Sequence, residues 1–468
     1  MTYFKKSLFI ACLPLLGLEF VLLLGCQSTS TEQKKMIAAE YAITNVSVLS
    51  ATADKFIANQ TVFINEGKII AIEAANTAAT TTIIEGKGKF LIPGLTEMHA
   101  HIPVADEGND SLVKETLFLY LSQGITNIRG MLGNPYHLGL RKEVADGKIL
   151  GPRIYTSSPS LNGNSIPTSE EAVSKITQYQ KDGYDFLKIH PGIKLAVWDA
   201  VEETANKVGI PYAGHVPVEV GIRRAIAAKY QTVDHIDGYL EGLVPTSANV
   251  DPSKNGFFGF DFTDLADPNL IAELVDKTVA NNVGIVATQS LFTRWFSPTA
   301  PEILGNEPEM KYMSPKTLFT WRQNKTQLIG SEAYNAEKWE RYIDIRKKLL
   351  KKMDEKGVTF LLGSDAPQVF NVPGFSIHHE LKAMSEAGLS NAKLLQAGTV
   401  NPASFFGAKG QYGTIENGAA ADLVLLSANP LDAIENARKI EGVMVGKDWL
   451  SKSFIQEKLA SIAQQYAE

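Results

Sequence analysis

The clearest chemical signal in this sequence is a pair of histidines one residue apart. His99 and His101 end an apolar run in FLIPGLTEMHAHIP, directly after a Pro-Gly turn. Because alternate side chains of a β-strand share a face, we expect the two imidazoles to point to the same side. Two neutral imidazoles facing one cavity suit a divalent metal ion, whereas the same pair on a solvated strand would be two ordinary polar residues. The metal interpretation therefore needs further ligands from elsewhere in the chain.

Candidates for these ligands follow other short apolar runs. Lys188 lies in DFLKIH, His215 ends YAGHV, His235 lies in VDHIDG, and Asp365 follows FLLGS. Each has a simpler alternative; a Gly-Ser-Asp, for example, is commonly a helix N-cap. Their shared position at the ends of predicted strands favours a common site, because active sites of α/β barrels lie at the carboxyl ends of the strands.

Lys188 has the most unusual predicted surroundings. Phe186 precedes it on its own face of the strand, and Leu187 and Ile189 lie on the opposite face. A charged ammonium buried there would be costly and would repel a dication. Desolvation should therefore lower the pKa of the lysine and free its amine to take up CO₂. The alternative is a lysine that reaches solvent or pairs with Asp185.

The elements that must position these residues alternate between apolar strands and amphipathic helices. SEEAVSKITQYQKDG and LAVWDAVEETANKVG carry apolar residues at helical spacing and end in glycine. Repeated strand–helix units predict an α/β fold, a (β/α)8 TIM-like barrel. A doubly wound sheet is the alternative, but it more often carries a Gly-rich phosphate loop after its first strand. The predicted strands are residues 96–101, 125–129, 153–157, 186–190, 212–215, 232–235, 283–288 and 358–363.

Both ends of the chain are rich in predicted β-strands. YAITNVSVLS and QTVFINEGKIIAIE near the N-terminus, and ADLVLLSANP and KIEGVMVGKDWL near the C-terminus, read as strands separated by turn residues. We therefore expect one small β-sandwich domain built from both chain ends. The predicted division is a signal peptide at 1–25, a tether at 26–40, the first part of the sandwich at 41–92, the barrel at 93–408, the second part of the sandwich at 409–450 and a C-terminal helix at 451–468.

The N-terminal segment has the pattern of an export signal. Two lysines precede a mostly apolar stretch, residues 7–24, and Pro14 and Glu19 interrupt it, which disfavours a permanent membrane span. The stretch leads into Leu-Leu-Gly-Cys, which resembles the lipobox of bacterial lipoproteins and implies cleavage before Cys26 and lipid attachment to its sulfur. We expect an exported protein, lipid-anchored in the cell envelope at the periplasmic face of the outer membrane. An ordinary signal peptide with an incidental cysteine is the alternative.

Composition narrows the class of protein and its partners. Of 468 residues, 44% are hydrophobic and 21% charged, as in folded globular proteins. A net charge of −6 gives no indication of a nucleic-acid partner. The cysteines are Cys12 and Cys26, and Cys12 lies in the segment expected to be removed, so no disulfide is expected. The sequence carries no signal for an oligomeric state.

Taken together, the motifs resemble the amidohydrolase superfamily, specifically its binuclear metal branch and the group of imidazolonepropionase-like and Xaa-Pro-type dipeptidase enzymes. The resemblance covers nearly all of the mature chain and rests on LIPGLTEMHAHIP, GYDFLKIH, GHV, DHIDG, LLGSDAP and NPASFFGAKGQYGTIENGAAADLVLLSANP. It implies two divalent metal ions; the ligand types favour zinc, and manganese, cobalt or iron would also suit them. In this branch one metal would be held by His99, His101 and Asp365 and the second by His215 and His235, with Lys188 bridging both as a carbamate.

The resemblance implies a metal-dependent amidohydrolase that cleaves an amide bond in a small molecule, a dipeptide or an N-acyl amino acid. Two cations lower the pKa of a bridging water to give hydroxide. Asp365 can accept the proton of the attacking water and pass it to the leaving nitrogen. The second hypothesis is hydrolysis or deamination of a cyclic amide. The third is a non-catalytic envelope lipoprotein that binds a ligand, and the full ligand set argues against it.

Further residues are candidates for roles around the metals. His137 follows the second predicted strand and Tyr239 lies four residues after His235, so both are candidates for substrate binding. For each of them a structural role is an equal alternative. His190 shares a strand face with Lys188 and is expected to orient a ligand. The two long connections, residues 238–282 and 290–357, are expected to form lids or substrate walls.

Overall fold

The protein has a mixed α/β fold, seen here in a computed structural model that describes residues 36–74, 78–79, 82–106 and 108–467. The predicted signal peptide, the lipidation site Cys26 and all but the last residues of the predicted tether lie outside the described residues. Within the described residues, no helix combines the length and the apolar character that a membrane crossing requires.

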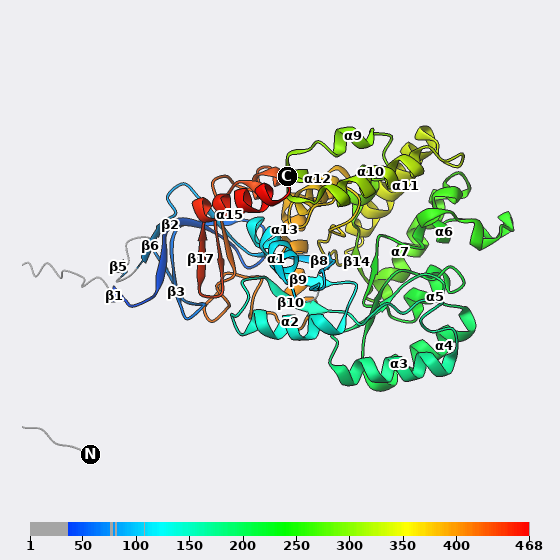
Figure 1. The fold of residues 1–468 in the computed structure, drawn as a ribbon, viewed down its shortest axis with the longest axis horizontal. Helices are drawn as coiled ribbons and strands as arrows, with labels where there is room; N and C mark the ends of the chain where they lie inside the picture. Colours follow the sequence, from blue (N-terminus) through cyan, green and yellow to red (C-terminus); the bar gives the residue numbers. More distant parts are fainter. Residues whose placement is uncertain (1–35, 75–77, 80–81, 107, 468) are drawn as a thin grey trace, which may run out of the picture. The chain divides into compact units, whose positions relative to one another are not determined.

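One sheet contains strands from both ends of the chain, drawn in blue and in red in Figure 1. Its order is β17-β16-β15-β7-β2-β3-β4, and β6 pairs with β2. Because β7 is parallel to β2 and antiparallel to β15, the strands from the two chain ends join in one continuous ladder. The strands are β2 (Tyr41–Leu49), β3 (Phe56–Asn65), β4 (Lys68–Ala74), β6 (Thr82–Glu85), β7 (Phe90–Pro93), β15 (Leu423–Leu426), β16 (Ile440–Val445) and β17 (Asp448–Ser451). A short parallel pair, β1 (Met36–Ile37) and β5 (Ala78–Ala79), is separate from it.

Alternate side chains of this sheet enter two different cores. Leu423 and Leu425 of β15 pack in a core within the sheet domain, whereas Val424 and Leu426 pack in the large core shared with the parallel strands. This is the period of two that a strand imposes. The packing between the sheet and the parallel strands is close, because a Cβ added at Gly124 would lie 2.8 Å from a methyl group of Val424.

The parallel strands form two hydrogen-bonded groups, β10-β9-β8 and β11-β12-β13-β14. A parallel bridge between Ser157 and Phe186 joins the two groups. Six of these seven strands are buried along their whole length, as expected for parallel strands covered by helices, whereas buried and half-buried residues alternate in β10. The strands are β8 (Leu95–Ala100), β9 (Ile125–Gly130), β10 (Arg153–Thr156), β11 (Leu187–Ile189), β12 (Tyr212–Gly214), β13 (Thr232–Asp234) and β14 (Gly284–Val286).

The segment predicted as the eighth strand, residues 358–363, is not a regular strand in the structure. It bridges β14 through Phe360, and a little further on Ala366 bridges β8. Between these points Leu362 N donates to the carbonyl oxygen of Ala397 at 2.9 Å. This bond takes the amide out of the strand ladder, which explains the difference from the prediction.

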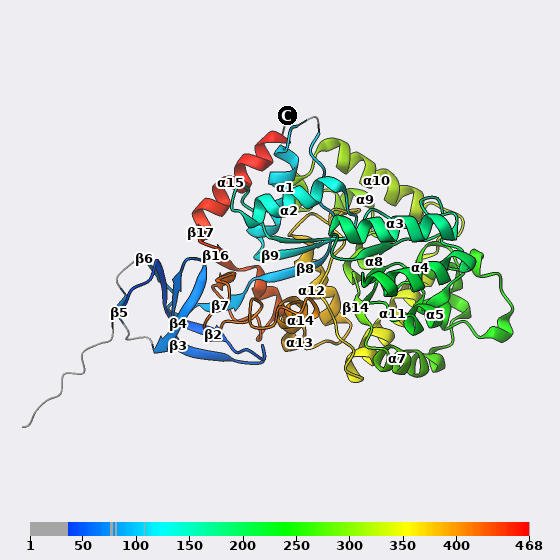
Figure 2. The ribbon, with the colours of Figure 1, turned by 90° about the horizontal axis from the view of Figure 1, so that it is seen from below.

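Helices cover the parallel strands, and their ends follow the sequence. The side chain of Thr168 caps α3 by accepting from Glu171 N, and both α3 and α4 end at glycines in the left-handed conformation, Gly183 and Gly209. The two helices lie side by side in both views (Figures 1 and 2). The helices up to the sixth strand are α1 (Ser111–Ser122), α2 (Pro135–Ala145), α3 (Ser169–Asp182), α4 (Leu195–Val208) and α5 (Gly221–Ala227).

The two long connections are folded into helices. Residues 238–282 contain α6 (Tyr239–Gly242), the 3-10 helices η1 (Thr246–Ala248), η2 (Pro252–Lys254), η3 (Phe257–Leu265) and η4 (Pro268–Leu270), and α7 (Ile271–Ala280). The second connection contains α8 (Gln289–Arg294), α9 (Pro301–Leu304), η5 (Pro308–Tyr312), α10 (Pro315–Ile329) and α11 (Ala336–Glu355). The remaining helices are α12 (Ser376–Glu386), α13 (Asn391–Gly398), α14 (Val400–Phe405), η6 (Ile434–Arg438) and α15 (Lys452–Gln465).

Candidate metal centre

The six residues predicted as metal ligands line one cavity of about 240 Å³ at the carboxyl ends of the parallel strands. Three of them follow immediately after a strand: His101 after β8, His215 after β12 and His235 after β13. The full set is His99, His101, Lys188, His215, His235 and Asp365. The ligand atoms of His99, His235 and Asp365 lie within 4.8 Å of one another, so these three residues could hold a metal ion.

Asp365 stands between the histidines. Its Oδ1 lies 2.7 Å from His101 Nε2 and 3.5 Å from His99 Nε2, and its Oδ2 lies 3.9 Å from His235 Nδ1. Asp365 and His235 both adopt left-handed backbone conformations, with φ of 63° and 65°. Such a conformation costs a residue with a side chain about 1–2 kcal/mol and persists only where its surroundings hold it. Here Arg346 donates to the carbonyl oxygen of His235 at 2.8 Å, and Asp365 N donates to that of His99 at 3.0 Å.

Burial keeps three imidazoles of the site neutral, those of His99, His215 and His235. It lowers the pKa of His99 and of His235 well below the usual value, and that of His215 to about 3, with the nearby Lys188 charge acting in the same direction. At neutral pH each of these three rings therefore has a lone pair available for a metal ion.

Lys188 presents an unpartnered amine to the cavity. The residue is completely buried, and its Nζ makes no hydrogen bond to any described residue. Burial lowers its pKa to about 8. Gly214 leaves the space that the amine occupies, because a Cβ there would lie 3.2 Å from Nζ. Asp185, the alternative partner, instead accepts from Arg141 at 2.7 Å. The pairing with Asp185 is therefore not formed.

Polar groups behind the histidines orient the rings, and the sequence analysis did not single them out. His215 Nδ1 donates to Asp237 Oδ2 at 3.0 Å, and the same oxygen accepts from Val216 N at 3.1 Å. Thr288 Oγ1 lies 2.9 Å from His235 Nδ1. A partner on the second ring nitrogen fixes which nitrogen faces a metal. Asp237 lies two residues after His235 in DHIDG, which was the signal available in the sequence.

A buried ion pair contacts the ring of His99. Asp234 Oδ2 lies 2.9 Å from His99 Nδ1, and its Oδ1 lies 3.1 Å from Arg129 Nη2. Thr232 Oγ1 donates to Asp234 Oδ1 at 2.7 Å. All four side chains are buried. His99 is therefore held by a network that spans β8, β9 and β13.

The remaining cavity wall is largely aromatic and comes from the two long connections. Phe257 and Phe258 belong to the first connection, and Leu291 and Trp295 to the second. His190 also lines the cavity, with its ring centroid 5.0 Å from that of His215. A wall of this kind limits the access of water to the polar groups at its base.

The two residues predicted to contact substrate do not line the cavity. His137 is buried on α2, where its ring lies beside the backbone of Ile102. Tyr239 is completely buried, and its hydroxyl lies 2.7 Å from Thr278 Oγ1 on α7. The structure places both residues in packing positions and does not bring them to the predicted site.

The family model that matches this chain is the Amidohydrolase family, over residues 90–450. The chain belongs to this family. It is a hydrolase that acts on carbon–nitrogen bonds, and amidohydrolases typically depend on metal ions. No curated protein matches the chain.

Several solved structures share the fold of this amidohydrolase at low sequence identity. A bottromycin amidohydrolase is 18% identical with a TM-score of 0.68, over 91% of this chain and 90% of that one. A Xaa-Pro dipeptidase with methionine bound in its active site is 19% identical with a TM-score of 0.61, over 88% and 99%. A prolidase complexed with N-methylphosphonate-L-proline is 17% identical with a TM-score of 0.60, over 88% and 99%.

Replacing the carboxylate behind His215 tests whether the histidines are held for a metal. In Asp237→Asn the charge that fixes the ring is lost, and metal affinity should fall by about 10–100-fold. Competition with a chelator of known affinity measures this. Asp264→Asn, which removes an exposed carboxylate paired with Arg341, is the matched control. Equal affinities in the two variants would contradict the orienting role of Asp237.

Proposed function

We propose that this chain is a metal-dependent amidohydrolase that cleaves the amide bond of a dipeptide or an N-acyl amino acid. The observation that carries the proposal is the single cavity of about 240 Å³ that His99, His101, Lys188, His215, His235 and Asp365 line together. Family membership supports the reaction type, and the Xaa-Pro dipeptidase and prolidase structures support a small-molecule substrate.

The donor set fits two divalent cations. Neutral imidazoles and a carboxylate are ligands that zinc accepts readily. In our proposal His99, His101 and Asp365 would hold one ion, and His215 and His235 the second. The unpartnered Nζ of Lys188 supports its carboxylation, because a neutral buried amine can add CO₂ and become an anionic oxygen ligand for both ions. When bound, the metal pair would lower the pKa of water and polarise the scissile carbonyl.

The chain's own groups then divide the work of proton transfer and positioning. Asp365 has one oxygen near His101 and the other facing His235, so one carboxylate can be a ligand and still move a proton. It would accept the proton from the water whose oxygen bonds to the carbonyl carbon, and deliver it to the nitrogen as the C–N bond breaks. The aromatic wall of Phe257, Phe258 and Trp295 would limit bulk water around these groups.

We also infer that the parallel strands close into a (β/α)8 barrel. Support comes from the bridge between Ser157 and Phe186, which links the two groups of strands. The segment 358–366 supports closure on the other side, because it bridges both β14 and β8. In such a barrel the ligands share the face where barrel enzymes keep their active sites.

A hydrolysis screen of the metal-loaded protein tests the proposed reaction. The panel contains dipeptides, N-acyl amino acids, lactones and cyclic amides. We expect release of an amino acid from a dipeptide or an N-acyl amino acid. Liquid chromatography measures this release. Turnover confined to a cyclic amide would replace the proposed substrate class.

In Asp365→Asn turnover should fall by about 10²–10⁴-fold or more while both metals remain bound. Asp264→Asn is again the control, and a loss of rate in proportion to lost metal would reduce Asp365 to a ligand.

Lys188 separates one-metal from two-metal chemistry. The wild-type chain purified without chelator should contain close to two metal ions, and Lys188→Ala should lose the metal pair and most activity. A short carboxylic acid should restore part of both, because it can replace the carbamate. Elemental analysis and turnover measure the effect, with the exposed Lys207→Ala as the control. Unchanged metal content in Lys188→Ala would refute the bridging role.

We propose further that the chain is exported and anchored through lipid on Cys26, for which the lipobox-like sequence is the support. In Cys26→Ser the precursor should remain unprocessed or unanchored, while the folded enzyme keeps its activity. Metabolic labelling with a radioactive fatty acid and fractionation of the envelope measure this. Equal labelling of both proteins would contradict the assignment of Cys26.

A further inference from the structure

A second cavity adjoins the candidate metal centre and shares one residue with it. This chamber has a volume of about 530 Å³, and His101 lines both cavities. Its walls come from α1, from η5 and the start of α10, and from the residues after Asp365. The side chains that line it include those of His101, Leu119, Thr317, Trp321, Pro367 and Tyr466.

The sizes of the two cavities indicate that they work together. Ligand cavities usually measure about 300–1,000 Å³. The metal cavity, at about 240 Å³, is below that range, whereas the chamber at about 530 Å³ is within it. A substrate that fills only the metal cavity would be very small. The part of a larger substrate that does not fit there would occupy the chamber on the other side of His101.

The lining of the chamber is mostly apolar and disfavours a negatively charged group. Leu112, Leu119, Tyr312, Met313 and Trp321 contribute apolar surface to it. Among the described residues that line the chamber, Glu115 is the one with a carboxylate. Its negative charge would repel the carboxylate of an amino acid. The part of an N-acyl amino acid that suits the chamber is therefore its acyl group and not its amino-acid end.

The wall of the chamber is preformed and fastened to the wall of the metal cavity. Lys325 on α10 is completely buried, and its ammonium donates to the carbonyl oxygens of Arg294, Trp295 and Ser297 at 2.7–2.9 Å. Trp295 itself lines the metal cavity. Arg294 also pairs with Glu307, just before η5. A chamber held in this way needs little reorganisation to bind a ligand.

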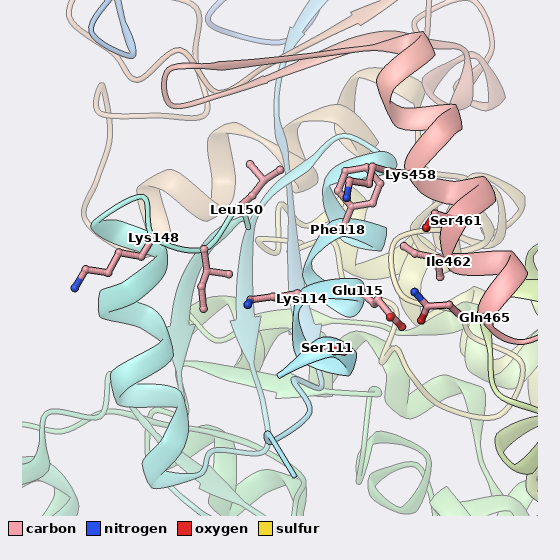
Figure 3. A pocket seen from close by; sticks show the side chains of 11 residues that line it. Ser111, Lys114, Glu115, Phe118, Lys148, Leu150, Lys458, Ser461, Ile462 and Gln465 are labelled. Carbon is pink, nitrogen blue, oxygen red and sulfur yellow. The ribbon is translucent and has the colours of Figure 1, made fainter. Parts of the chain in front are cut away.

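Tyr466 lines the chamber beside α1, and its hydroxyl donates to Glu115 at 2.8 Å. Glu115 also lines a separate surface pocket of about 330 Å³ between α1 and α15. Figure 3 shows Glu115 reaching from α1 toward Gln465 in that pocket. Glu115 thus lines both spaces, and its contact with Tyr466 lies where the chamber meets the surface pocket.

We propose that this chamber binds the apolar acyl group of the substrate, so that the enzyme prefers amino acids acylated with a medium-length aliphatic or an arylalkyl acid. The proposal rests on the proposed function, since it places the scissile amide beside His101. It makes the chamber, and not the metal cavity, the determinant of acyl specificity.

The test compares N-octanoyl-glycine with N-acetyl-glycine in binding and in hydrolysis. Each methylene that leaves water strengthens binding about fourfold, and chain ordering takes back part of the gain. We expect the octanoyl compound to bind at least about 10²-fold more tightly by isothermal titration calorimetry, and kcat/KM to rise in the same order. Equal binding of the two compounds would overturn the proposal and leave the proposed hydrolysis intact.

Two threonines on α10 provide a matched pair of variants. Thr317 lines the chamber, whereas Thr320 is exposed on the same helix, and each hydroxyl has one local polar contact. Thr317→Phe should fill the chamber and remove most of the octanoyl advantage, while Thr320→Phe keeps it. If Thr317→Phe does not fold, Leu112→Trp fills the same chamber from a half-exposed position on α1.

The contact between Tyr466 and Glu115 gives an independent check on the preferred chain length. Tyr466→Ala should join the chamber to the surface pocket and shift the preferred chain beyond octanoyl, whereas Tyr466→Phe keeps the wall and the original preference. Tight octanoyl binding that Thr317→Phe abolishes, without hydrolysis of any N-acyl amino acid, would support the chamber and refute the proposed reaction. An octanoyl preference unchanged in both filling variants would refute the chamber.

Discussion

The geometry of the site depends on the buried ion pair between Arg129 and Asp234. Their charged atoms lie 3.1 Å apart with both side chains completely buried, and Arg129 also donates to Met98 O at 2.7 Å and to Thr232. A charge pair removed from water is tolerated only when hydrogen bonds satisfy its remaining atoms, and loss of one partner costs about 3–5 kcal/mol. The pair therefore fixes β8, β9 and β13 relative to one another, and with them the position of His99.

The same low-dielectric interior sets the chemistry of the site. Burial lowers the pKa values of the His99, His215 and His235 imidazoles and brings that of Lys188 to about 8, so that nitrogen lone pairs are available near neutral pH. Burial also raises the pKa of Glu97 to about 8. Glu97 accepts from the backbone amides of His99 at 3.0 Å and Ser364 at 2.8 Å, so one buried side chain aligns a β8 ligand with the residue before Asp365. Burial in the same interior thus sets the protonation of the ligands and helps to hold them in position.

Local periodicity was enough to predict which residues meet at the strand ends, because strand alternation acts on neighbours such as His99 and His101. It was not enough where the chain leaves the strand. His235 and Ile236 both have positive φ, and Gly238 follows with φ of 75°, so the chain turns away and Tyr239 enters the helical layer. Contacts across strands, such as that of His215 with Asp237, depend on register and turn direction. Local spacing does not encode these.

The two long connections explain how one set of ligands can be combined with a particular substrate class. The first supplies Phe257 and Phe258 to the metal cavity; the second supplies Trp295 there and Trp321 to the adjoining chamber. Ordering the second connection is costly, since each ordered residue loses about 1–2 kcal/mol of backbone freedom. Folding it into helices around the buried ammonium of Lys325 offsets that cost with carbonyl contacts and apolar burial. The strand ends can then keep the ligands fixed while the connections alone change the shape of the space beside them.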